Sequence, residues 1–183
     1  MKSRIIVTTF VALFLVGSTA MAGDIGFKGI GGKVGLLGPE GGIGSTIAFG
    51  AVVELGTIMP NLAIEAEVLY WSKGYDYVYG SWSYSDIIIG ALAKYHFSKK
   101  STGMQPYAGG GLGFVMFKAS WDDASGYSDY LTDYSSTDIG ITGLGGIEYP
   151  FSPSMKGFAE FRYTIGGWDF WGIFGGLVFK MGK

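Results

Sequence analysis

The chain has 183 residues, a formal net charge of −2 and no cysteine; 15% of its residues are charged and 33 are glycine. This charged fraction lies well below the roughly 25% that is usual in soluble domains. The lack of cysteine excludes disulfides and cysteine-ligated metals, and the slightly acidic balance gives no support for nucleic-acid binding.

The first segment of the chain is typical of an export signal. Lys2 and Arg4 form a short basic region, Ile5–Val16 is apolar, and Ala20-Met21-Ala22 is a small-residue cleavage site. The apolar run is shorter than the roughly 20 residues that a membrane-spanning helix requires. We therefore predict a removed signal peptide over residues 1–22 and one domain over residues 23–183.

The remainder divides at its turn signals into eight segments whose hydrophobicity alternates with a period of two. Successive side chains of a strand point to opposite faces, so each segment is predicted to be a strand. Each also reaches the roughly 9–11 residues that a tilted strand needs to cross a bilayer. In chain order they are Ile25–Leu37, Thr46–Thr57, Asn61–Trp71, Ser83–Phe97, Gln105–Ser120, Thr137–Phe151, Met155–Gly166 and Asp169–Met181.

One face of these strands carries the charges and the other carries none. Apolar rows such as Ile87, Ile89 and Ala91 are unbroken on the uncharged face. A soluble lipocalin-like barrel would turn that face inward, but its water-facing side would then expose residues such as Trp71 and Phe117. Lys or Arg facing lipid costs about 2–4 kcal/mol at the bilayer midplane. The predicted fold is therefore an all-β, eight-stranded, antiparallel up-and-down transmembrane β-barrel with its charges inside.

The connections differ in length at the two ends of this barrel. Compact turn signals lie at Met59-Pro60, Ser98–Met104 and Ser152–Ser154, and longer links at Gly38–Ser45, Ser72–Trp82 and Ala119–Ser136. Bacterial outer-membrane barrels have short periplasmic turns and longer extracellular loops. We predict periplasmic termini and an external loop over residues 122–138, which is hydrated and flexible or, alternatively, holds Ca²⁺ through its carboxylates.

Aromatic residues are predicted to form girdles at both membrane surfaces. The expected outer girdle contains Tyr70, Tyr84, Trp121, Tyr163 and Trp171, and the inner girdle contains Phe27, Tyr95, Phe97, Tyr149, Phe151 and Phe179.

The inward charges are predicted to form one network. Its members are Lys33, Glu54, Glu65, Glu67, Lys94, Glu148, Glu160, Arg162 and Lys180, with His96 at the rim. Buried charges persist when they are paired, and the interior of an eight-stranded barrel is filled by side chains. A salt-bridged plug is the favoured interpretation, and a proton or ion path through the same groups is the alternative.

The inward residues of the outer half are mainly apolar. Leu69, Trp71, Ile88, Phe117, Phe170 and Phe174 form a candidate binding site for a small apolar ligand. The alternative is that these side chains interdigitate and leave no hollow.

His96-Phe97-Ser98 resembles the His-x-Ser pairing of barrel-type lipid A deacylases. The topology puts it at the periplasmic end of its strand, whereas those enzymes work at the outer leaflet. We therefore expect no enzyme activity, catalytic residue, cofactor or metal site.

The run from Pro106 to Phe114 resembles the P-Y-x-G-x-G-x-G-aromatic strand of small outer-membrane proteins, and Gly176–Met181 resembles their C-terminal assembly signal. The chain is similar to the OmpA-like, OmpX-type and OmpW-type barrels of the outer membrane protein beta-barrel domain family. It departs from them by ending in Met181-Gly182-Lys183 instead of a terminal aromatic residue.

This resemblance implies a non-enzymatic envelope protein of the bacterial outer membrane, either structural or interacting through its external loops. The alternative, implied by OmpW-type members, is a narrow conduit or binding site for small hydrophobic molecules, and a lipid A-modifying enzyme is a distant third. The expected partners are outer-membrane lipid, lipopolysaccharide and, during biogenesis, the barrel-assembly machinery, with no nucleic acid. The expected state is a monomer.

Overall fold

The computed structural model describes residues 24–77, 80–98, 103–123, 133–167 and 169–181. The predicted signal peptide over residues 1–22 lies outside this set. Within it, no helix is long and apolar enough to cross a membrane.

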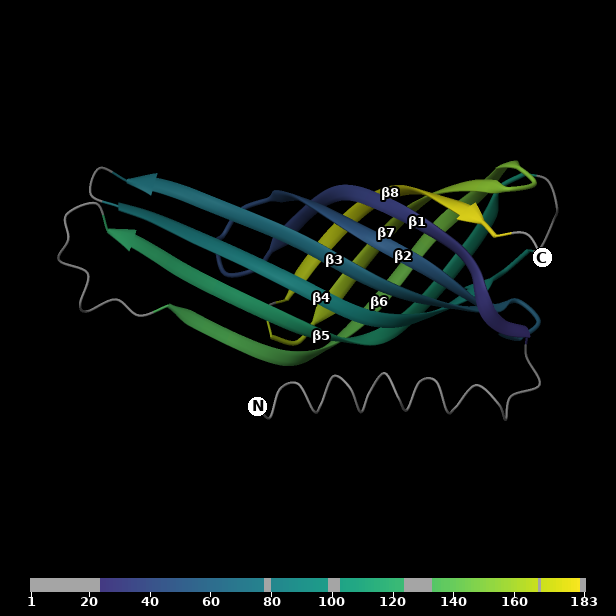
Figure 1. The fold of residues 1–183 in the computed structure, drawn as a ribbon, viewed down its shortest axis with the longest axis horizontal. Helices are drawn as coiled ribbons and strands as arrows, with labels where there is room; N and C mark the ends of the chain where they lie inside the picture. Colours follow the sequence, from purple (N-terminus) through teal and green to yellow (C-terminus); the bar gives the residue numbers. More distant parts are fainter. Residues whose placement is uncertain (1–23, 78–79, 99–102, 124–132, 168, 182–183) are drawn as a thin grey trace.

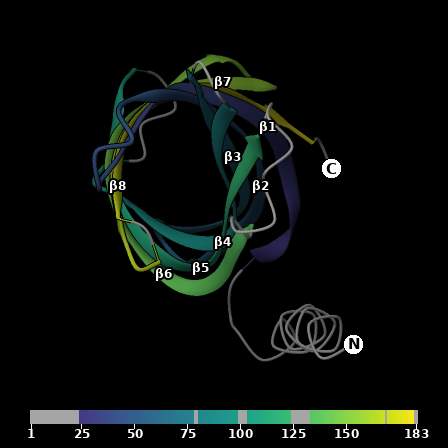
Figure 2. The same cartoon turned by 90° about the vertical axis from the view of Figure 1, so that its left-hand side faces the viewer.

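Eight strands form a single closed sheet, as predicted. Each strand pairs antiparallel with the next along the chain, and the first pairs with the last (Figures 1 and 2). Their bounds are β1 (Asp24–Pro39), β2 (Thr46–Met59), β3 (Leu62–Tyr77), β4 (Gly80–His96), β5 (Gln105–Asp123), β6 (Tyr134–Ser152), β7 (Met155–Ile165) and β8 (Phe170–Lys180). Closure pairs the edges that an open sheet would leave free.

The alternation of side chains is the one that the sequence predicts. Ile87 and Ile89 are 41% and 46% exposed on the outside of β4, whereas Ile88 between them is 3% exposed. On β7, Phe161 points outward and the neighbouring Arg162 is fully buried. The outer surface is thus an apolar belt, and the charges point into the barrel.

The strands end at a similar level at one end of the barrel and at different levels at the other. The turn end carries the short β2–β3 and β6–β7 turns and the first and last described residues, Asp24 and Met181. At the opposite end, β3, β4, β5 and β6 extend well past their neighbours (Figure 1). Pairing of β2 with β3 stops at Trp71, and pairing of β7 with β6 stops at Ile141. The part of β3–β6 beyond these pairs is a four-stranded extension, here called the projecting sheet.

The projecting sheet corrects the predicted strand ends. Ser72–Trp82 is not a long link, because β3 continues to Tyr77 and pairs with β4 down to Gly80. The serines and glycines of this segment suggest a loop, but the alternation of β3 continues into it, with Tyr75 half-buried between the exposed Gly74 and Asp76. Residues 124–132, the centre of the predicted external loop, lie outside the described residues.

The outward belt changes from apolar to polar at a defined level. Tyr70, Ile87 and Met116 are cross-strand neighbours and form its last apolar row. The next outward row contains Ser72, Ser85 and Lys118. A lysine side chain is unfavourable in the hydrocarbon layer, whereas an apolar side chain is not. This level therefore marks the edge of the lipid-facing belt.

Two of the predicted girdle residues face inward instead. Tyr84 packs against the buried apolar cluster, and Trp121 contacts Trp82 with ring centroids 4.6 Å apart. Both have the parity of inward residues on their own strands, Asp86 on β4 and Phe117 on β5. Their positions near the ends of their strands predicted that they would lie in the outer girdle. Their parity, however, decides which face of the sheet they occupy.

Candidate functional site in the barrel lumen

The centre of the lumen is closed by a cluster of ion pairs. Arg162 from β7 makes a two-point contact with Glu67 from β3, at 2.6 Å for Nη1–Oε1 and 2.8 Å for Nη2–Oε2. Its Nη2 also donates to Glu160 Oε1 at 2.7 Å. Lys33 from β1 donates to the same Glu67 carboxylate. Charge-assisted bonds of this two-point kind hold both partners in fixed orientation.

A second group of ion pairs continues toward the turn end. Lys94 Nζ lies 2.9 Å from Glu65 Oε2 and 3.3 Å from Glu160 Oε2. Tyr107 donates its hydroxyl to Glu160 Oε2 at 3.0 Å. Glu160 therefore joins the central cluster to this second group.

Lys156 is a member of the network that the sequence interpretation missed. It lies 2.6 Å from Glu148 Oε2 and also pairs with Glu54. Its inward orientation could have been predicted, because Lys156 shares the parity of Glu160 and Arg162 on β7. Because Lys156 lies beside the Ser152–Ser154 turn, the sequence alone suggests a turn residue there.

Lys180 does not join the ion pairs among the described residues. Its side chain is exposed near the end of β8, where it lines the mouth of a cavity. The other eight predicted charges lie together in the interior. Lys180 has the predicted parity but sits at the rim, where water rather than a carboxylate solvates it.

A cavity of about 400 Å³ opens at the turn end. Its lining includes Glu54, Glu65, Lys94, His96, Glu148 and Lys156. It does not include Arg162, Glu67 or Lys33, so the cavity ends against the central cluster. The lumen is thus open to water from the turn end only as far as these ion pairs.

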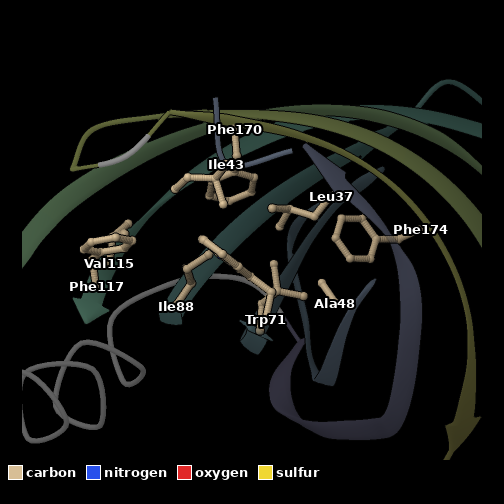
Figure 3. Packing of buried hydrophobic residues seen from close by; sticks show 10 residues of the cluster. Leu37, Ile43, Ala48, Trp71, Ile88, Val115, Phe117, Phe170 and Phe174 are labelled. Carbon is tan, nitrogen blue, oxygen red and sulfur yellow. The ribbon is translucent and has the colours of Figure 1, made fainter. Parts of the chain in front are cut away.

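The other half of the lumen is an apolar plug. The six residues predicted there all belong to one buried cluster, which also contains Leu37, Ala48 and Val115. Figure 3 shows these side chains converging from different strands. The rings of Trp71 and Phe117 lie 6.4 Å apart, and the members are no more than 5% exposed. Such burial and contact indicate interdigitated side chains.

Ile43, from the link between β1 and β2, closes this plug at its top and was not predicted. It is 5% exposed and belongs to the same cluster (Figure 3). The Tyr75 hydroxyl donates to its carbonyl oxygen, and Lys73 donates to the carbonyl of Ser45. The link is therefore fastened across the mouth of the barrel.

Asp86 is a second residue that the sequence interpretation missed. Its side chain lies in the apolar half, is 1% exposed, and belongs to none of the ion pairs among the described residues. Its cross-strand neighbours are Trp71 on one side and Phe117 on the other. Parity could have placed it inside, but only the register shows that it lies between two rings.

His96 has no geometry for nucleophile activation. Its Nε2 lies 3.2 Å from Glu148 Oε2, and its Nδ1 has no hydrogen-bond partner among the described residues. Neither nitrogen therefore bonds to Ser98. Among the residues that the structure describes, no three acidic or histidine side chains are grouped so that they could hold a metal ion.

A closed sheet with an apolar outer belt and an ion-paired interior defines a transmembrane β-barrel, and the even strand number is that of bacterial outer-membrane barrels. The model of the Outer membrane protein beta-barrel domain family matches residues 8–170. The chain belongs to this family, which is one of the bacterial outer membrane.

Solved structures with the same fold have low sequence identity to the chain. Neisserial surface protein A matches with a TM-score of 0.58 and 19% identity, over 84% of this chain and 97% of that one. Ail, the attachment invasion locus protein of Yersinia pestis, matches with 0.56 and 10%, over 86% and 99%. A major outer membrane protein of Thermus thermophilus matches with 0.55 and 13%, over 84% and 99%. No curated protein sequence matches the chain.

Proposed function

We propose that this chain is a non-enzymatic outer-membrane protein whose closed barrel anchors an interaction surface outside the cell. The observation that carries the proposal is the contrast between the two parts of the molecule. The lumen is blocked by the cluster of Arg162, Glu67 and Lys33, while β3–β6 extend past the lipid-facing belt. A protein built to pass solutes has no need of the projecting sheet, and one built to present a surface has no need of an open lumen.

The proposed orientation puts the turn end in the periplasm and the projecting sheet outside. Short turns are periplasmic in outer-membrane barrels, and longer strands and loops are extracellular. In this orientation the lipid-facing belt contacts phospholipid and lipopolysaccharide. We further propose that the barrel-assembly machinery inserts the chain and that it works as a monomer.

The ion-pair cluster argues for a plug rather than an ion path. The side chains of Arg162 and Glu160 have no exposed surface, and that of Glu67 is 1% exposed. Breaking a buried pair by taking away one partner costs several kcal/mol, because the other charge stays buried without compensation. An ion would have to displace these pairs in order to pass.

The alternative of a conduit for small hydrophobic molecules needs a hollow in the apolar half. The packed cluster between Trp71 and Phe174 favours the surface role over it. One of the similar structures is named an attachment invasion locus protein, which supports surface interaction as a use of this fold.

Two measurements test the proposal. In planar bilayers, the purified protein should give no steady open-channel current, and a stable conductance would overturn the plug. Because the chain has no cysteine, single-cysteine variants report orientation cleanly. In intact cells, Ser83→Cys should react with a membrane-impermeant maleimide and Ser154→Cys, exposed at the turn end, should not. The reverse pattern would overturn the orientation.

A further inference from the structure

The inner face of the projecting sheet carries successive rows of aromatic side chains. Tyr75, Trp82 and Trp121 are cross-strand neighbours in the outermost row whose side chains are described. The next row contains Lys73, Tyr84 and Ala119, and the row below it contains Trp71, Asp86 and Phe117. The sheet is therefore aromatic on the side that faces the barrel axis.

The rings in these rows form a continuous series. The centroids of Trp121 and Trp82 lie 4.6 Å apart, and those of Trp82 and Tyr84 lie 6.4 Å apart in nearly parallel planes. Tyr84 is in turn 6.1 Å from Phe117. The upper members are only half-buried, whereas Phe117 is buried in the plug. The series runs from an open surface to the top of the apolar cluster.

The two faces of the projecting sheet have the opposite character to those of the lipid-facing part, where the outer face is apolar. On the outer face of the projecting sheet, Ser72, Ser83 and Ser85 replace the apolar belt. The rings lie on the opposite face, above the level at which the belt ends. They are therefore not a girdle that contacts lipid. Packing against the apolar cluster accounts for Tyr75 and Tyr84 but not for Trp82 or Trp121. Half-buried aromatic faces beside water are a surface suited to recognition.

Asp86 places an acidic side chain at the foot of this series. Its carboxyl group lies between Trp71 and Phe117 and directly below Tyr84 on β4, and no lysine, arginine or histidine among the described residues pairs with it. The other buried carboxylates of the described lumen all face a lysine, arginine or histidine. A buried charge is screened far less than an exposed one, so it acts on a cation that sits on the rings above it.

The protein itself shows how a cation meets these rings. Lys73 Nζ lies 5.8 Å from the centroid of Tyr75, which is within the usual range for a cation–π contact. Most of the described charged residues at the projecting-sheet end of the barrel are acidic. The acidic residues are Glu40, Asp76, Asp133, Asp138 and Asp169, and the basic ones are Lys73 and Lys118.

We propose that the aromatic rows of Trp82 and Tyr84, with Asp86 as counter-charge, bind an organic cation such as an alkylated ammonium group. The ring faces supply the quadrupole attraction and dispersion contacts that such groups require, and the acidic surroundings attract them. The inference deepens the proposed surface function and rests on it only for the claim that the ligand arrives from outside. Saccharides, which also stack on aromatic rings, lack the charge that Asp86 would favour.

Binding is tested on the full-length protein in a non-ionic glucoside detergent, because zwitterionic detergents carry the same ammonium group. The probe is benzyltrimethylammonium, and its neutral isostere is neopentylbenzene. Calorimetry should detect the cation and give at least about tenfold weaker binding of the isostere. Asp86→Asn should weaken the cation by about tenfold and leave the isostere unchanged. Trp82→Leu should weaken both.

Asp76→Asn is the matched control, since Asp76 lies on the polar outer face of the same sheet and is exposed. It removes the same charge and should change the cation affinity less than about twofold. Circular dichroism and heat-dependent gel mobility identify variants that keep the folded barrel. Equal binding of the cation and the isostere, or equal effects of the two Asp→Asn variants, would overturn the proposal. Because this assay does not depend on orientation, its failure is distinct from failure of the labelling test.

Discussion

The central ion pair predicts a non-additive effect that can be measured. Within the group of ion pairs linked through Glu67 and Glu160, three cations balance three carboxylates: Lys33, Lys94 and Arg162 against Glu65, Glu67 and Glu160. Arg162→Met leaves two cations opposite three carboxylates in a site enclosed by the barrel. Since breaking a buried pair costs about 3–5 kcal/mol, the free energy of unfolding should fall by about that amount. Glu67→Met should have a similar cost, for the opposite excess charge.

The double variant Arg162→Met/Glu67→Met restores the balance at two against two. Its stability should return to within about 1–2 kcal/mol of the original protein, because a hydrophobic pair of similar volume replaces a buried ion pair at little cost. The coupling energy of the cycle is then about 3 kcal/mol or more.

Guanidinium chloride unfolding in lipid vesicles, followed by tryptophan fluorescence, gives these free energies if the m-values agree. Lys180→Met is the control, since it removes one positive charge from the exposed rim and should cost less than about 0.5 kcal/mol. The reasoning fails if Arg162→Met costs no more than Lys180→Met, or if the two single effects simply add.

Three further predictions follow from packing and lipid exposure. Gly31→Ala should destabilise the barrel by about 1–3 kcal/mol, because the added Cβ would lie 2.2 Å from a backbone oxygen of β8; Gly32→Ala, where the nearest atom is 3.8 Å away, should be tolerated in the same unfolding assay. Ile89→Arg puts a charge on the lipid-facing belt and should cost about 2–4 kcal/mol, whereas Ser83→Arg above the belt should cost under about 1 kcal/mol; equal costs would contradict the assigned boundary. Ile43→Ala should cost about 2 kcal/mol and speed hydrogen exchange of the β1–β2 link, and unchanged exchange would show that Ile43 does not hold it down.

Much of the fold could be predicted because its signal is local. The period-two alternation and the segregation of charge to one parity define eight strands and their two faces without any knowledge of neighbours. Strand ends were less accurate. The segment from Ser72 to Trp82 is rich in small polar residues, yet pairing with the adjacent strands extends β3 and β4 through most of it.

Parity by itself determined which side chains point to the inside of the barrel and that an apolar half lies beside the charged one. It could not determine which of them meet, because Arg162 and Glu67 are far apart in sequence and only strand order and register bring them within 2.6 Å. Register likewise places Asp86 between Trp71 and Phe117, and closure of the mouth by Ile43 depends on a loop with no periodicity. The sequence thus decides the face of each side chain through the geometry of a single strand, whereas contacts across strands depend on how the closed sheet aligns them.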